Sequence, residues 1–194
     1  MATSKFRENN IRMTFAEALK HLQPGDLFFT SGNYTFSSAI KKITNSDISH
    51  VGVIGYVYDR CVVFESAEGD GVRVVPLAHY LYNYENSKKA YKGQIFFARH
   101  RNFPKDPAVQ KIFFQVAVDL LNYNYDNPEG KKILLDRLLS MGKRTENDAY
   151  ICSEYIERLF FSINLKFAGD AKGFVYPEHI AADPNVDVIA EIIP

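Results

Sequence analysis

The stretch Tyr150-Ile151-Cys152-Ser153-Glu154-Tyr155-Ile156, near the end of a chain of 194 residues, places a cysteine where a helix is expected to begin. Apolar residues recur at helical spacing from Ile151 to Ile163, and Asn147 or Asp148 is the expected N-cap. Cys152 would then lie in the first turn, where the positive end of the helix dipole favours a thiolate and free N–H groups can bind an oxyanion. Most free cysteines are unreactive buried side chains, so Cys152 is informative only together with other motifs.

A histidine with a suitable context lies about a hundred residues earlier, in Ser49-His50-Val51-Gly52-Val53-Ile54. These residues predict that His50 stands at the start of a strand. An imidazole titrates near neutral pH and can act as the general base for a thiol, whereas a plain structural histidine is the alternative. His21, His79, His100 and His179 have no comparable context. No pair of His or Cys residues has metal-ligand spacing, so we expect no metal site.

Glu65 is the candidate for the group that orients His50. It interrupts the apolar run Val63-Phe64-Glu65-Ser66, where a carboxylate is costly unless it is paired. A tight turn at Asp59-Arg60 would leave Glu65 four residues from His50, roughly 13 Å away. A longer loop over residues 56–60 would bring the two side chains almost opposite each other. The catalytic hypothesis therefore predicts the longer loop, and an outward-facing Glu65 is the alternative.

The order of the expected elements indicates an α+β fold in which an antiparallel sheet packs against helices. A helix over 14–21 is expected to be capped by Thr14 and Glu17, and Asp106-Pro107 and Asn127-Pro128 are helix-start signals. Another short helix is expected over 36–44, and strands are expected over 26–30, 51–58, 62–66, 72–75 and 94–99. The tail is expected to be a loop with one strand over 186–189. Without a repeat or linker, residues 1–194 are expected to form a single domain.

Composition restricts the classes of partner. Lys plus Arg and Asp plus Glu are 23 each and the pI is near 7.0, which argues against nucleic-acid binding. The two cysteines form no disulfide framework. No apolar run is typical of a signal peptide or a membrane span, so a cytoplasmic location is expected unless a leader was removed.

Several of these motifs together resemble a known family. The segments are Pro24-Gly25-Asp26-Leu27-Phe28-Phe29, Ser49-His50-Val51-Gly52-Val53, Phe64-Glu65-Ser66-Ala67 and Tyr150-Ile151-Cys152-Ser153-Glu154. They resemble the core of the NlpC/P60 papain-like hydrolases, over roughly residues 24–67 and 150–160. In common members the cysteine helix comes first. Here it comes last, as in the circularly permuted branch that includes the YiiX-like bacterial proteins and the lecithin retinol acyltransferase-like enzymes.

The resemblance implies a permuted papain-like fold with Cys152 as nucleophile and His50 as base. Glu65 matches the position of the polar residue that orients the histidine, and a glutamate there fits the YiiX-like branch best. Ser153-Glu154 stands where cell-wall members usually have Ser-Gly, which weakens the case for a peptidoglycan stem peptide as substrate. We interpret Glu154 as a charge at the helix start rather than as part of the pocket.

Three functional hypotheses follow. The leading one is a cysteine hydrolase that cleaves a peptide or N-acyl amide bond through an acyl-enzyme and needs no cofactor. The second is an acyltransferase or lipid-acyl hydrolase of the lecithin retinol acyltransferase-like type, and the third is a non-catalytic ligand-binding module. Tyr34 and Tyr150 are candidates for a hydroxyl donor near the oxyanion or for the pocket wall. Cys61, just after an expected turn, is interpreted as structural.

Overall fold

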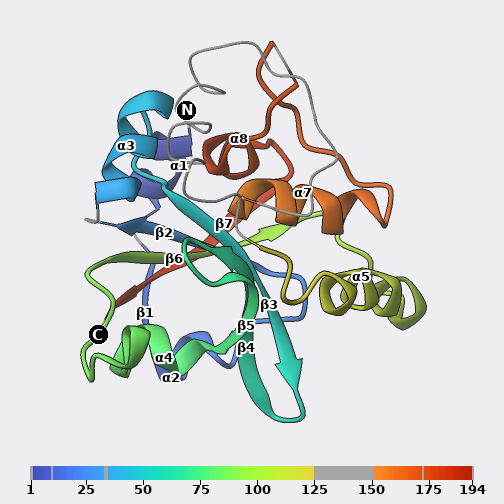
Figure 1. Cartoon of the computed structure of the whole chain (residues 1–194), viewed down its shortest axis with the longest axis horizontal. Coiled ribbons are helices and arrows are strands. Elements are labelled where there is room, and N and C mark those ends of the chain that lie inside the picture. Colours follow the sequence, from blue (N-terminus) through green and yellow to red (C-terminus); the bar gives the residue numbers. More distant parts are fainter. Residues whose placement is uncertain (1, 10, 33–34, 125–150, 172, 194) are drawn as a thin grey trace.

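A mixed sheet lies at the centre of the computed structural model, which describes residues 2–9, 11–32, 35–124, 151–171 and 173–193 (Figure 1). Within them the sheet has seven strands in the order β1-β7-β6-β2-β3-β4-β5. Neighbouring strands run antiparallel except β1 and β7, which are parallel. The strands are β1 (Arg12–Thr14), β2 (Leu27–Gly32), β3 (His50–Val57), β4 (Arg60–Ala67), β5 (Gly71–Pro76), β6 (Gly93–His100) and β7 (Val186–Ile193). The α+β fold class is therefore confirmed.

Helices pack against both faces of this sheet (Figure 1). On one face Phe29 and Val53 join a hydrophobic cluster with residues of α1, α5, α7 and α8. On the other face Phe28 and Ile54 join a cluster with residues of α2 and α4. Successive residues of a strand point to opposite faces, so each central strand supplies both clusters. The helices are α1 (Ala2–Glu8), α2 (Phe15–Ala18), α3 (Thr35–Thr44), α4 (Leu77–Tyr82), η1 (Tyr84–Asn86), α5 (Pro107–Asp119), α7 (Cys152–Phe161) and α8 (Pro177–Ala182).

Local capping signals predicted two helix starts correctly. The Thr14 side chain accepts a hydrogen bond from the N–H of Glu17, and the Glu17 carboxylate accepts one from the N–H of Thr14. Asp106 caps α5, and its carboxylate accepts the N–H of Ala108 at 2.8 Å. In both places a short side chain satisfies backbone donors that a helix start leaves without partners.

Other expectations about the elements were wrong or fall outside the described residues. The tail is not a loop with a single strand, because it also contains α8, which begins with Pro177. The helices α1 and α4 and the short strand β1 were not predicted. The helix expected after Asn127-Pro128 lies outside the described residues.

The β3–β4 hairpin does not have the longer loop that the catalytic hypothesis predicted. Val57 pairs with Arg60, and Val53 pairs with Phe64, so the turn consists of Tyr58 and Asp59 alone. Tyr58 has a φ of 53°, in the left-handed region that two-residue hairpin turns require. This register places Gly52, rather than His50, beside Glu65.

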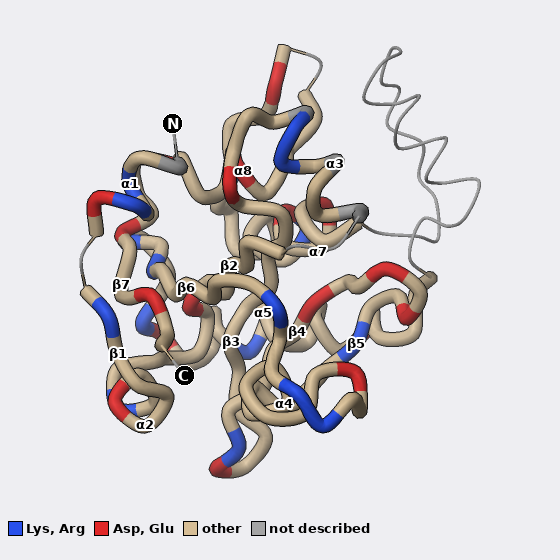
Figure 2. Tube along the Cα trace, turned by 90° about the vertical axis from the view of Figure 1, so that its left-hand side faces the viewer, with Lys and Arg blue, Asp and Glu red and all other residues tan. Residues whose placement is uncertain are grey.

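The described part of the chain has neither a segment dominated by one sign of charge nor a long apolar helix. Lys and Arg residues are interspersed with Asp and Glu residues along the trace (Figure 2). Among the described residues, no helix combines the length and the apolar character needed to span a bilayer.

Candidate active site

Cys152 is the first residue of α7, and its side chain is buried, with 3% of its surface exposed. The N-cap is Ile151, so the expectation of Asn147 or Asp148 as N-cap was wrong; both lie outside the described residues. The carboxylate of Glu154 accepts the N–H of Ile151 at 3.3 Å, which agrees with its interpretation as a helix-start charge. Cys152 thus occupies the first turn, as expected, although the helix begins later.

His50 is the first residue of β3; it lines the same cavity as Cys152 and lies near enough for Cys152 to raise the pKa of its ring. Along β3 it shares a face with Ile54, in the cluster on the α4 side, whereas Cys152 packs in the cluster on the α7 side. The two side chains can meet because His50 stands at the end of its strand, where the sheet no longer separates the layers. The sequence therefore brings a thiol and an imidazole together from elements on opposite faces.

Glu65 lies on β4 with none of its side-chain surface exposed. Its Oε2 atom is 2.7 Å from Nε2 of His50, and it accepts the hydroxyl of Tyr80 at 2.5 Å. Its Oε1 atom accepts Nε of Arg73 at 2.9 Å and lies 2.8 Å from Nη2 of the same guanidinium. The carboxylate is costly to bury alone, and these four contacts offset that cost.

The electrostatics of this cluster favour charged forms of both His50 and Glu65. Burial alone would lower the pKa of His50, but hydrogen bonds and opposite charges from Cys152 and Glu65 raise it from 6.5 to about 10. Burial alone would raise the pKa of Glu65, but His50, Arg73 and Tyr80 lower it from 4.5 to about 2. At neutral pH the arrangement therefore favours an imidazolium at His50 beside a carboxylate at Glu65.

The contact between His50 and Glu65 forms without the predicted loop because the two residues are diagonal neighbours. Diagonal positions in an antiparallel pair are about 7–8 Å apart, within reach of long side chains. Gly52 lies between them on the same face, and a Cβ there would come within 2.8 Å of Val63 and 3.4 Å of the Glu65 Cβ. The absence of a side chain at Gly52 leaves space for the diagonal contact.

Two residues of the cluster were not predicted. Arg73 lies directly opposite Glu65 in the β4–β5 pair. Counting the register outward from the Glu68-Gly69-Asp70 turn would have paired the two opposite charges. Tyr80 lies on α4, which has no strong start signal in the sequence: its N-cap, Pro76, makes no side-chain capping bond.

A cavity of about 150 Å³ lies beside Cys152 and His50. Tyr80, Tyr84 and Tyr91 form part of its wall and pack against one another, with ring centroids 4.9–5.6 Å apart. The remaining described lining residues are Thr30, Ser37, Ser49, Ala67, Glu68 and Glu85. Tyr34 and Tyr150, the predicted hydroxyl donors, lie outside the described residues.

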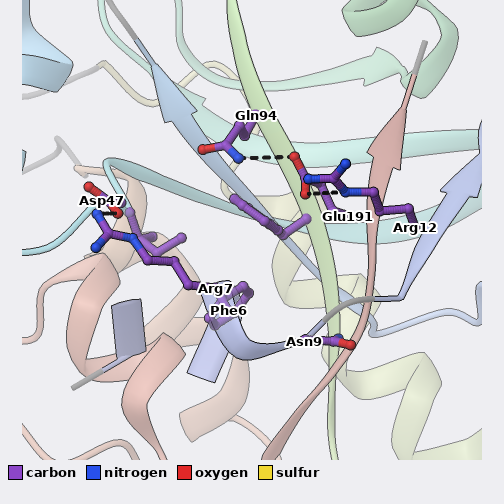
Figure 3. A pocket seen from close by; sticks show the side chains of 9 residues that line it. Phe6, Arg7, Asn9, Arg12, Asp47, Gln94 and Glu191 are labelled. Carbon is purple, nitrogen blue, oxygen red and sulfur yellow. Dashed lines mark hydrogen bonds and ion pairs between the residues drawn. The ribbon is translucent and has the colours of Figure 1, made fainter. Parts of the chain in front are cut away.

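A second cavity, of about 170 Å³, lies beside α1, β1, β6 and β7 (Figure 3). Its charged groups are paired: Arg7 with Asp47, and Arg12 with Glu191 at 3.3 Å. Gln94 also donates to Glu191 at 2.9 Å. No cysteine, serine or histidine is among its described lining residues, so the cavity at Cys152 is the candidate active site.

The fold is also that of a solved bacterial structure. YiiX from Escherichia coli O157:H7, described as a metalloprotein, has a TM-score of 0.64 to this chain at 20% identity, covering 89% of this chain and 98% of that chain. At this identity the similarity shows the fold alone. Within the described residues of this chain, no three His, Cys, Asp or Glu side chains are grouped so that they could hold a metal ion. These residues therefore do not fit a metal centre.

The sequence comparisons identify the family. No curated protein matches the chain. Residues 21–171 match the family described as permuted papain-like amidase enzymes, YaeF/YiiX, C92. The match covers more than half of the chain and spans His50, Glu65 and Cys152, and it confirms the resemblance to the permuted branch. The chain therefore belongs to the YaeF/YiiX (C92) family of permuted papain-like amidases.

Proposed function

We propose that the protein is a cysteine amidase in which Cys152 is the nucleophile, His50 the proton carrier and Glu65 the residue that orients His50. The observation that carries the proposal is the bridging position of His50. It shares a cavity with Cys152, which raises the pKa of its ring, and its Nε2 atom lies 2.7 Å from a carboxylate oxygen of the fully buried Glu65. Burying a carboxylate and a histidine together at the start of a cysteine helix has a direct explanation in catalysis.

The proposed reaction has two stages. The Cys152 thiolate attacks the amide carbonyl carbon, and the backbone N–H of Cys152, which has no acceptor within its own helix, binds the oxyanion that develops. His50 gives its proton to the departing amine as the C–N bond breaks, and an acyl-enzyme remains. In the second stage His50 removes a proton from water, the resulting hydroxide attacks the thioester, and the acid product leaves as the thiolate re-forms.

Atom assignment follows from the ring chemistry of histidine. Nε2 of His50 faces Glu65, so we assign Nδ1 to the Cys152 sulfur. Glu65 then accepts the Nε2 proton throughout the cycle and fixes the tautomer, which leaves Nδ1 to exchange a proton with thiol, leaving group and water.

The cavity favours a small polar acyl group over a lipid chain. A volume of about 150 Å³ holds about five water molecules. Its described lining consists mainly of side chains that carry hydroxyl or carboxylate groups, so the cavity offers a polar rather than an apolar environment. Short N-acyl amides that carry hydroxyl or amine groups are thus the proposed substrate class, ahead of the lipid acyl donors of the acyltransferase alternative.

Alkylation of the two cysteines tests the proposal. Iodoacetamide at pH 6 is expected to modify Cys152 at least about tenfold faster than a free thiol, because an imidazolium partner holds the sulfur as a thiolate. Cys61 provides an internal control: burial raises its pKa to about 11, so it should stay unmodified. Mass spectrometry of the digested protein identifies the labelled residue.

The non-catalytic alternative makes the opposite prediction. A Cys152 that reacts at pH 6 no faster than free cysteine would support a binding module and contradict the amidase proposal. The His50→Gln variant supplies the matched control, because it keeps the size of the side chain but removes the cation. In that variant the rate at Cys152 should fall to that of an ordinary thiol.

A further inference from the structure

We propose that Tyr80 is a positioning residue that acts on His50 through Glu65. The Tyr80 hydroxyl donates to the same Glu65 oxygen, Oε2, as the His50 ring, and so limits how strongly Glu65 stabilises the protonated form of His50. The inference rests on the proposed function of Cys152 and His50, and it assigns to α4 a part in proton transfer.

The two carboxylate oxygens of Glu65 contact different donors, and this difference supports the proposed role of Tyr80. Oε1 of Glu65 is held by the Arg73 guanidinium through two contacts, at 2.8 and 2.9 Å. Oε2 is shared between the Tyr80 hydroxyl at 2.5 Å and Nε2 of His50 at 2.7 Å. Each donor on an oxygen reduces the negative charge available to the other donor. Tyr80 therefore competes with His50, whereas Arg73 does not share that atom.

The Tyr80 hydroxyl is held in place by packing that is independent of Glu65. The side chain is 3% exposed, and its ring centroid lies 4.6 Å from that of Phe28. It also packs against Tyr84 and Tyr91, and the N–H of Tyr91 donates to the Tyr80 carbonyl at 2.7 Å. A ring fixed on several sides keeps its hydroxyl directed at one oxygen.

The hydroxyl acts as a donor rather than as a second anion. Burial and the neighbouring charge of Glu65 raise the pKa of Tyr80 well above its usual value, so its proton stays bound. The groups that face this cluster come from five elements: His50 on β3, Arg73 on β5, Tyr80 on α4, Tyr84 on η1 and Cys152 on α7. Asp70 in turn faces Arg73. Replacing Tyr80 with phenylalanine removes one neutral donor and leaves all of these charges in place.

The direction of the effect follows from that change. Without the Tyr80 hydroxyl, Oε2 carries more negative charge toward His50, so the imidazolium becomes more stable and its pKa rises. A hydrogen bond to a charged group is strong, so we expect the proton affinity of His50 to increase about threefold to tenfold. Proton delivery to the leaving amine should slow in the same direction.

The test measures His50 by NMR in the Cys152→Ala background. Cys152 raises the pKa of His50, so removing the Cys152 side chain brings the titration into a more accessible pH range. Long-range ¹H–¹⁵N spectra of the ring, assigned by the loss of a signal in His50→Gln, would be recorded with and without Tyr80→Phe. The expected result is a higher titration midpoint in the Tyr80→Phe protein.

Tyr155→Phe is the matched control. Tyr155 is another buried tyrosine, and its hydroxyl donates to the Ala117 carbonyl at 3.1 Å, away from Glu65. A purely structural role for Tyr80 predicts that both Phe variants lose stability and that neither changes the midpoint. An unchanged or lower midpoint in Tyr80→Phe would overturn the inference.

The outcome is distinguishable from failure of the amidase proposal. The titration uses a protein that lacks the nucleophile, so it reports on the Tyr80–Glu65–His50 chain whether or not the enzyme turns over. An unreactive Cys152 together with a shifted midpoint would refute the amidase but retain the coupling. A reactive Cys152 with an unshifted midpoint would do the reverse.

Discussion

Replacing Cys152 with alanine is expected to lower kcat/KM for a susceptible short-chain amide by at least about four orders of magnitude. The variant has no nucleophile, and direct attack by water cannot form the acyl-enzyme. The fold should survive although the Cys152 side chain is buried, because alanine removes only one heavy atom. We expect the free energy of unfolding to change by about 1 kcal/mol or less, as measured by urea denaturation.

Two companion variants separate loss of the nucleophile from loss of any thiol. Cys61→Ala removes the other cysteine, which lies on β4 beside Tyr56, and should retain wild-type turnover. Cys152→Ser replaces the sulfur with an oxygen nucleophile of similar size. This variant should have little more activity than Cys152→Ala, since a hydroxyl is far less acidic than a thiol. Turnover in Cys152→Ala above a few per cent of the wild type would contradict the proposed role of Cys152.

The parts of the fold that could be predicted from sequence are those with local causes. The Thr14-Glu17 capping box and the Asp106-Pro107 start each depend on residues within one helical turn. The central strands were predicted because β-branched and aromatic residues cluster there between turn residues. Such signals need no knowledge of the rest of the chain.

Register and side-chain reach were predicted poorly because they depend on pairs of residues far apart in sequence. The longer hairpin loop was expected only because directly opposite positions were considered. The structure instead joins His50 and Glu65 diagonally across Gly52. A two-residue turn is compatible with the contact between His50 and Glu65, because the Glu65 side chain is long enough to reach diagonally and Gly52 has no side chain in the way.

The chemistry-bearing residues of the candidate site could be predicted, but their supporting partners could not. Cys152, His50 and Glu65 stand out because a thiol, an imidazole and an isolated carboxylate are unusual in apolar surroundings. Tyr80 does not stand out, because tyrosines are common in this chain and α4 begins without a capping side chain. Its role depends on the packing of α4 against β4, which is a tertiary property.

The Glu65→Gln variant is expected to lose about 3–5 kcal/mol of stability near pH 5.5, as well as most activity. Glutamine keeps the shape but removes the charge, so the Arg73 guanidinium and the His50 imidazolium lose their shared buried partner. The pKa of His50 should fall toward its usual value, and the Cys152 sulfur would then lose its imidazolium at neutral pH. We expect kcat/KM to fall about 10²- to 10⁴-fold, because the orienting carboxylate fixes the tautomer and the position of the histidine.

The stability loss should depend on pH in a way that identifies the ion pair. The pKa of Glu65 lies below its usual 4.5, at about 2, so its contribution is present above pH 4.5 and is lost as the pH falls through 2. The pKa of His50 lies above its usual 6.5, at about 10, so its contribution is complete below pH 6.5 and is lost as the pH rises through 10. The difference between wild type and Glu65→Gln should therefore be largest between pH 4.5 and 6.5 and smaller at pH 10.

Asp26→Asn is the matched control for this experiment. Asp26 is also a buried carboxylate held by an arginine, with Nε of Arg99 at 2.6 Å and Nη2 at 2.7 Å, but it has no contact with His50. Its replacement should destabilise the protein and leave the alkylation rate of Cys152 at pH 6 unchanged, whereas Glu65→Gln should lower both. Equal effects of the two variants on that rate would mean that Glu65 supports the fold and not His50. The Asp26–Arg99 pair does not contact His50, so Asp26→Asn can change the alkylation rate only through a general loss of stability. An equal effect of Glu65→Gln would therefore remove Glu65 from the proposed mechanism as the orienting carboxylate.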